Sequence, residues 1–168
     1  SDGRRILMSS DRGGNPDLWV LDLVSQELQQ MTDDPTPDWL GTWSPDQQHI
    51  AFYAYRSGNR DVWVMPDSGG TPRQVTRNDA SDVAPSWNPD GERIAFYTSR
   101  NGSADIWTIS LEDGSERPLV AGPAQDRFPK FSPDGEWVVY SSWSAGQSAL
   151  YRIPAQGGDP EPLTMTSA

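Results

Sequence analysis

The stretch that decides the fold runs from Asp82 to Trp107, DVAPSWNPDGERIAFYTSRNGSADIW. It contains an apolar strand ending at Trp87, a tight Asn-Pro-Asp-Gly turn, a second apolar strand, a polar loop around Gly102, and the start of a third strand at Asp105. Proline fixes φ and glycine supplies positive φ, so Pro-Asp-Gly favours a tight turn. The stretch therefore predicts an antiparallel β-sheet unit.

This unit recurs along the chain at a constant spacing of 44 residues. The matching positions include the turn residues Asp2, Asp46, Asp90 and Asp134, the loop residues Gly14, Gly58, Gly102 and Gly146, and the third-strand aromatics Trp19, Trp63, Trp107 and Tyr151. A period in the low forties with four short strands per unit is typical of a β-propeller blade. We expect an all-β propeller domain over 1–168, with four-stranded antiparallel blades at 38–76, 82–120 and 126–164, and a blade without its first strand at 1–32.

We name the strands of each blade A to D, starting at the central channel. The second strand is an almost continuous apolar run, as expected for a sheet covered on both faces by neighbouring blades. Prolines in strand D mark it as the outer edge, because proline cannot donate to a strand ladder. The side chains expected to be buried between blades are Trp43, Trp87, Phe131, Ile50, Phe52, Ile94, Phe96, Trp63 and Trp107.

The blades resemble those of the TolB propeller family, which is similar to WD repeats. The resemblance rests on Trp-Ser-Pro-Asp at 43–46, Ile-Ala-Phe-Tyr at 50–53, and Arg-Ser-Gly-Asn-Arg-Asp-Val-Trp-Val at 56–64. It covers essentially the whole chain and is specific for the fold, but not for an activity, since a fold does not carry a function with it. It implies a periplasmic or secreted location.

Composition narrows the classes of partner. The chain has 24 acidic and 13 basic residues, a net charge of −11, which disfavours nucleic acid as a partner. No stretch is long enough to span a membrane, so we expect no membrane insertion. The first blade lacks strand A, and only four residues follow the last strand D. We therefore expect an open ring, closed by another copy of the chain or by the rest of a larger propeller.

Three aspartates recur just before strand A, the innermost strand: Asp38, Asp82 and Asp126. They are predicted to ring one mouth of the channel. Converging carboxylates could bind a hard cation such as calcium, or the basic groups of a peptide. The alternative is that each aspartate caps the backbone of its own loop. If they converge, repulsion should raise at least one pKa, with Arg127 and Arg77 as the nearest counter-charges.

Trp39 departs from the repeat, because its counterparts are Val83 and Arg127. A tryptophan there is not required by the fold, so it either recognises a ligand or covers the neighbouring blade. With Arg127 and the three aspartates, it completes the predicted binding residues. They lie among the longer B–C and D–A loops, which share one face of the propeller and form the predicted binding surface.

Catalysis has little support in the sequence. His49 is the only histidine and follows a Pro-Asp turn on the short-turn face, where we expect a solvated surface residue. A Ser-His-Asp triad needs a base that faces a nucleophile, and no Gly-x-Ser-x-Gly motif is present. Metal-dependent lyases on related propellers use a histidine cluster, which one histidine cannot supply.

The sequence therefore predicts a non-catalytic binding or scaffold module, without a cofactor unless calcium binds, whose partner is a protein or peptide. The alternative is the propeller of a prolyl-oligopeptidase-type serine peptidase, which would restrict access of substrates to a separate hydrolase domain.

Overall fold

The computed structural model describes residues 3–164, in which every regular element is a β-strand. The strands form one three-stranded and three four-stranded antiparallel sheets. Blade 1 contains β1 (Arg5–Ser10), β2 (Asp17–Asp22) and β3 (Leu28–Gln30). Blade 2 contains β4 (Asp38–Trp43), β5 (His49–Ala54), β6 (Asp61–Pro66) and β7 (Arg73–Gln74). Blade 3 contains β8 (Asp82–Trp87), β9 (Arg93–Thr98), β10 (Asp105–Ser110) and β11 (Glu116–Val120), and blade 4 contains β12 (Gln125–Phe131), β13 (Trp137–Ser144), β14 (Gln147–Pro154) and β15 (Glu161–Pro162).

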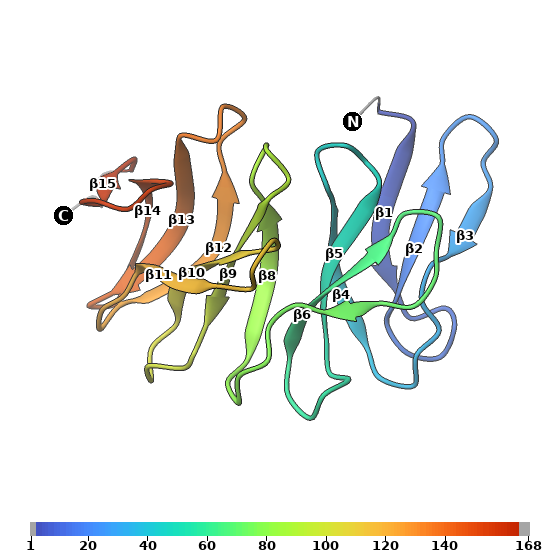
Figure 1. Cartoon of the computed structure of the whole chain (residues 1–168), viewed down its shortest axis with the longest axis horizontal. Helices are drawn as coiled ribbons and strands as arrows, with labels where there is room; N and C mark the ends of the chain where they lie inside the picture. The colour runs from blue at the N-terminus through green and yellow to red at the C-terminus, as the bar shows by residue number, and fades with distance from the viewer. Residues whose placement is uncertain (1–2, 165–168) are drawn as a thin grey trace.

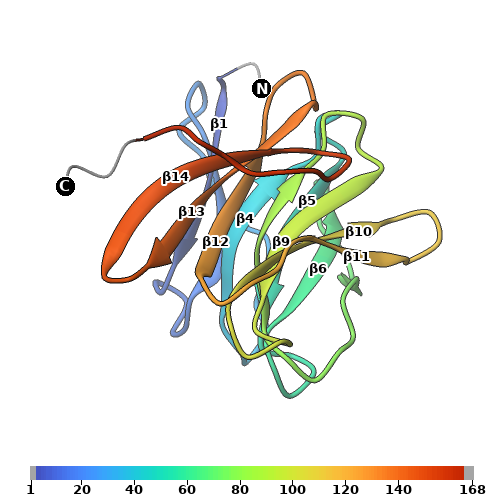
Figure 2. The same cartoon turned by 90° about the vertical axis from the view of Figure 1, so that its left-hand side faces the viewer.

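The four sheets stand side by side in chain order, from blade 1 on the right of Figure 1 to blade 4 on the left. Figure 2 looks at the molecule from the side of blade 4 and shows the sheets stacked behind one another. Each sheet pairs its strands strictly in sequence order, as expected for a meander of short hairpins. The prediction of an all-β propeller with four-stranded antiparallel blades is confirmed.

The core consists of three apolar clusters, one at each junction between neighbouring blades. In the middle junction, Ala51 and Val62 of blade 2 pack against Trp87, Ile94 and Phe96 of blade 3. The predicted burial of Ile50, Phe52, Ile94 and Phe96 is complete, since none of the four is exposed to solvent. Trp87 is also buried.

The prediction of burial was wrong in degree for four other aromatics, which are only partly buried: Trp43, Trp63, Trp107 and Phe131. Each of the three tryptophans packs against an apolar cluster and also has the guanidinium of an arginine near its ring. The guanidinium of Arg5 lies 5.0 Å from the centre of the Trp43 ring, and that of Arg100 lies 4.2 Å from the Trp107 ring. These contacts combine burial with cation–π attraction.

Each innermost strand of the complete blades carries a β-bulge that the sequence did not predict. The ladder shifts register between Trp39 and Thr42 in β4, and at the matching place in β8 and β12. The bulged residues Leu40, Ala84 and Phe128 have φ between +49° and +56°. A bulge inserts an extra residue and bends the strand. A positive φ is uncommon for residues other than glycine. Recurrence at a spacing of 44 residues makes the bulge part of the blade design.

Candidate functional site

The three aspartates at the start of the innermost strands are almost completely buried: Asp38 and Asp82 are the first residues of β4 and β8, and Asp126 is the second residue of β12. The structure does not bring them together. Asp38 accepts a hydrogen bond of 3.2 Å from Arg56 Nε, and Asp82 pairs with Arg100 Nη2 at 3.2 Å. Residues 3–164 contain no group of three acidic, histidine or cysteine side chains that could hold a metal ion. The geometry favours a structural role within each blade.

The predicted counter-charges were wrong. Arg127 donates to Gln125 Oε1, and Arg77 donates to the carbonyl oxygen of Gln74. The arginines that pair with the aspartates come instead from the B–C loop of the same blade, 18 residues further along the chain. Strand A and the B–C loop meet at the same end of the blade, so only the folded sheet reveals this pairing.

Burial raises the pKa of Asp38, Asp82 and Asp126 above the ordinary aspartate value. The sequence predicted a raised pKa only if the three carboxylates repelled one another, whereas the first cause at each of them is desolvation. Hydrogen bonds and charge from arginine oppose this effect at Asp38 and Asp82. At Asp126 the opposing contribution comes from the hydroxyl of Ser142, while the charge of Asp105 raises the pKa further. Within residues 3–164 no basic side chain forms an ion pair with Asp126, because Ser144 stands where Arg56 and Arg100 stand.

Trp39 covers its own blade and not a neighbour. Its ring stacks on Tyr53 of the adjacent strand, with ring centres 5.3 Å apart, and the Arg60 guanidinium lies 5.8 Å from the Trp39 ring. Trp39 and Tyr53 are both partly exposed. Trp39 is thus partly accessible to solvent, and Arg127 is exposed, both on the long-loop side.

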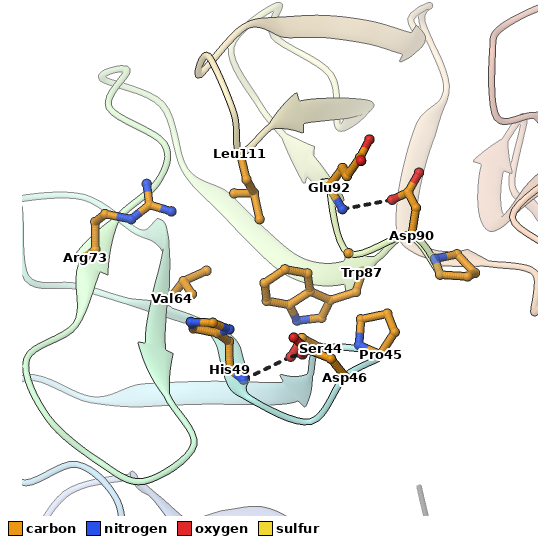
Figure 3. Close-up of a pocket in the computed structure, with 12 residues that line it drawn as sticks. Ser44, Pro45, Asp46, His49, Val64, Arg73, Trp87, Asp90, Glu92 and Leu111 are labelled. Carbon is orange, nitrogen blue, oxygen red and sulfur yellow. Dashed lines mark hydrogen bonds between the residues drawn. The ribbon is translucent and has the colours of Figure 1, made fainter.

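A groove opens on the opposite side of the propeller, between the short turns of blades 2 and 3 (Figure 3). Its volume is about 550 Å³, within the range typical of ligand pockets. Trp87, Val64 and Leu111 contribute apolar surface, together with Pro45 and Pro89 of the A–B turns. The polar side chains around it are Ser44, Asp46, His49, Arg73, Asp90 and Glu92.

The equivalent place at the junction of blades 1 and 2 is bridged by a charged contact, next to a cavity of about 600 Å³ lined by Arg5, Val20 and Gln29. Arg5 Nη1 lies 2.7 Å from the Asp67 carboxylate, and the indole N–H of Trp43 donates to the same carboxylate at 2.6 Å. Asp67 belongs to the C–D turn that follows β6. In blade 3 its counterpart is Leu111, which has no group for such a bond.

The junction of blades 3 and 4 is bridged in a different way. Arg117, on β11, donates to the carbonyl oxygens of Ala155 at 2.9 Å and Gln156 at 3.0 Å. These two residues form the C–D turn after β14. Ala155 is buried and small, so the arginine can lie against the backbone of the turn.

The middle junction lacks both contacts. Arg73 is the counterpart of Arg117, but within the described part of the chain its guanidinium makes no hydrogen bond or ion pair. Leu111 takes the position of Ala155 with a larger side chain that lines the groove. His49 takes the position of Arg5; it is exposed, as expected, and only its backbone amide bonds to Ser44 Oγ, at 2.9 Å (Figure 3). The indole N–H of Trp87 donates a hydrogen bond of 3.1 Å to the carbonyl oxygen of Thr42.

Comparison with known protein families identifies the family of this chain. The sequence model of the TolB beta propeller domain matches residues 73–168, more than half of the chain. The chain belongs to the TolB beta propeller family. The matched residues include blades 3 and 4, and blades 1 and 2 are built from the same repeated unit.

Solved structures similar to this TolB-type propeller include two TolB proteins. A protein of Agrobacterium tumefaciens provisionally assigned as TolB superposes with a TM-score of 0.89 at 25% identity, over 97% of this chain and 62% of its own. TolB from Acinetobacter baumannii gives 0.80 at 22% identity, over 93% and 39%. The chain thus spans less than two thirds of either protein. Oligogalacturonate lyase from Vibrio parahaemolyticus, at a TM-score of 0.61 and 12% identity over 99% and 63%, shares the fold alone. A search among curated proteins found no match.

Sequence reasoning missed the groove because its residues come from four strands and three turns of two blades. A signal was nevertheless present: Leu23, Asp67, Leu111 and Ala155 occupy one repeat position yet differ in polarity and size. When the residue type at one repeat position differs between blades, the junctions that this position lines can differ in shape and polarity. Residues 3–164 contain no helix able to span a membrane.

Proposed function

We propose that this TolB-type propeller is a non-catalytic binding module that holds a peptide segment of a partner protein in the groove between blades 2 and 3. One observation carries the proposal. Three junctions share one architecture. In two of them an arginine bonds to the C–D turn of the following blade, whereas in the middle one the described residues make no such contact. The sequence had placed the binding surface on the long-loop face; the groove lies on the short-turn face.

The walls of the groove suit a peptide. Trp87 and Leu111 offer apolar surface to one or two side chains, and aromatic surface contributes strongly to recognition. The rigid sheets on both sides hold these residues in place without a ligand, which lowers the entropy cost of binding. Membership of the TolB beta propeller family is consistent with this class of function.

The polar groups of the groove do not form a hydrolytic site. The Ser44 hydroxyl donates to Asp46 at 2.5 Å and accepts from the backbone amide of His49. The His49 imidazole makes no hydrogen bond to Ser44 within the described residues. A serine nucleophile needs a base aligned with its hydroxyl proton. Here the Ser44 hydroxyl donates its hydrogen bond to the Asp46 carboxylate of the same turn and not to His49. The arrangement caps a turn, and we therefore propose binding without catalysis.

A random 12-residue phage-displayed peptide library, selected against the wild-type protein, tests this proposal. Leu111→Asp introduces the residue found in the bridged junction of blades 1 and 2, and should weaken binding of the selected peptides by at least tenfold. Val24→Asp, a similar change at an exposed site on blade 1, is the matched control and should leave binding unchanged. Selected peptides that bind wild type and Leu111→Asp equally would show that the groove is not the site.

Other predicted features complete the proposal. A further copy of the chain, or the rest of a larger propeller, is the partner predicted to close the ring, and native mass spectrometry tests this. A periplasmic or secreted location follows from the family resemblance and is checked by cell fractionation. The peptidase alternative stays a prediction that no contact in the groove favours.

A further inference from the structure

The two bridged junctions share a chemical feature. In each, an arginine binds oxygen atoms supplied by the C–D turn of the following blade. Arg5 binds the carboxylate of Asp67, and Arg117 binds the main-chain carbonyl oxygens of Ala155 and Gln156. The two arginines come from different positions of the repeat, Arg5 from strand B and Arg117 from strand D. Both bind oxygen acceptors of the same turn, in junctions that also contain the aromatic ending strand A, Trp43 in the first and Phe131 in the second.

At the middle junction Arg73 is the counterpart of Arg117, but within the described residues it donates to no oxygen of the blade 3 turn. Arg73 and the side chain of Leu111 both line the groove instead. The guanidinium is planar, remains charged and carries five donors in a fork that matches a carboxylate. Because Arg73 has no partner within residues 3–164, its donors are free to bind a ligand.

Arg73 is the one arginine among the described residues that line the groove, and three carboxylates line it as well: Asp46, Asp90 and Glu92. Figure 3 shows Arg73 on the blade 2 side and Asp90 and Glu92 on the blade 3 side, with Trp87 between them. The Asp90 carboxylate accepts from the Asn88 side chain at 2.9 Å and the Glu92 amide at 2.8 Å, so it is used within its own turn. The Asp46 carboxylate likewise accepts from Ser44 Oγ at 2.5 Å, and Asp90 lies 3.7 Å from Arg93 Nη2. A carboxylate of a ligand would therefore be attracted to Arg73, whose charge has no partner among the described residues of the groove.

We propose that the groove recognises a carboxylate next to a large apolar side chain, with Arg73 binding the carboxylate and Trp87 and Leu111 contacting the apolar group. This inference rests on the proposed function and names the chemistry of its peptide. The carboxylate is either the C-terminus of a peptide or the side chain of an acidic residue. Paired, bidentate hydrogen bonds of this kind are stronger than neutral ones and add geometric specificity.

Two small probes test the carboxylate directly: N-acetyl-L-leucine and its neutral analogue N-acetyl-L-leucinamide. Each is titrated into ¹⁵N-labelled wild-type protein while the Arg73 Nε–H and Trp87 Nε1–H signals are followed by NMR. The acid should bind at least tenfold more tightly than the amide. In Arg73→Gln the two probes should bind equally weakly. Arg77→Gln, an exposed arginine four residues away, is the matched control and should behave as wild type.

Two further measurements sharpen the result. Arg73→Lys keeps the charge but loses the fork, so it should retain only part of the preference for the acid. A third probe, N-acetyl-Leu-Glu-amide, carries its carboxylate on a side chain. Preference for this probe over N-acetyl-L-leucine supports an internal acidic residue as the source, and the reverse preference supports a C-terminus.

Equal affinity for N-acetyl-L-leucine and its amide in the wild-type protein would overturn the inference. So would a preference for the acid that survives in Arg73→Gln. Failure here is distinguishable from failure of the proposed function: library peptides that lose affinity with Leu111→Asp but not with Arg73→Gln would support the groove and overturn the carboxylate.

Discussion

Blades 3 and 4 are built from the same positions of the repeat, yet their interiors differ. In blade 3 the buried Asp82 pairs with Arg100, whose guanidinium also covers Trp107. In blade 4 the equivalent Asp126 has Ser142 as its hydrogen-bonding neighbour and, within the described residues, no basic partner. Tyr151 replaces the tryptophan, and its ring stacks on Tyr140, with ring centres 5.9 Å apart.

The difference shows that strand pairing does not depend on the ion pair. Both sheets have four strands in the same order and a bulge at the same position of strand A. The blade is specified by apolar patterning and turns, while the aspartate–arginine pair is an addition that a blade can lose. Such a loss leaves a buried carboxylate whose charge is poorly compensated, which costs stability at neutral pH.

The largest effect is expected from truncating the aromatic that ends strand A. Trp87→Ala should lower the free energy of unfolding by about 3–5 kcal/mol, because Trp87 is buried and donates its indole N–H to Thr42. Phe131→Ala, the same change in blade 4, should cost less, because Phe131 is only partly buried. Urea denaturation of both variants measures the comparison. Equal losses would contradict the difference in burial between the blades.

A second prediction removes the ion pair of blade 3. Arg100→Gln should destabilise the protein by roughly 3 kcal/mol, because it leaves the Asp82 carboxylate buried without its cation. Arg127→Gln, at an exposed arginine in blade 4, should stay within about 0.5 kcal/mol of wild type. Urea denaturation at pH 7 measures both. An Arg100→Gln variant as stable as wild type would show that the ion pair contributes nothing to the free energy of unfolding.

A third prediction supplies blade 4 with the residue that blade 3 has. Ser144→Arg places an arginine 18 residues after Asp126 and should stabilise the protein by about 1 kcal/mol. The gain should vanish when the same substitution is made in an Asp126→Asn background, which a double-mutant cycle measures. A gain that persists without the carboxylate would indicate a different cause.

The smallest effect concerns pH. Burial raises the pKa of Asp126, so the folded protein binds this proton more readily than the unfolded chain. The stability that this carboxyl contributes is present below its ordinary pKa and is lost as pH rises through the raised, folded-state pKa. Relative to wild type, Asp126→Asn should therefore become more stable between about pH 4 and pH 7. Urea denaturation across this range checks the trend, and a difference independent of pH would contradict it.

Much of the architecture follows from the sequence alone. The 44-residue spacing, the Pro-Asp-Gly turns and the apolar run of strand B predict the propeller and the burial of Ile94 and Phe96, because these features are local and repeated. The innermost position of Asp82 also follows from its place in the repeat. What it bonds to does not, because Arg100 reaches it only when strand A and the B–C loop are folded together.

The groove depended on tertiary structure for a different reason. Trp87, Arg73 and Leu111 belong to separate strands and turns of two blades, and their proximity arises when those blades pack. Whether a junction is bridged or open depends on a few side-chain volumes and acceptors across it, such as Leu111 where another blade has Ala155. The repeat by itself determined the scaffold, since every blade must satisfy the same backbone hydrogen bonds. Packing of unlike side chains between the blades decided where the scaffold leaves a site.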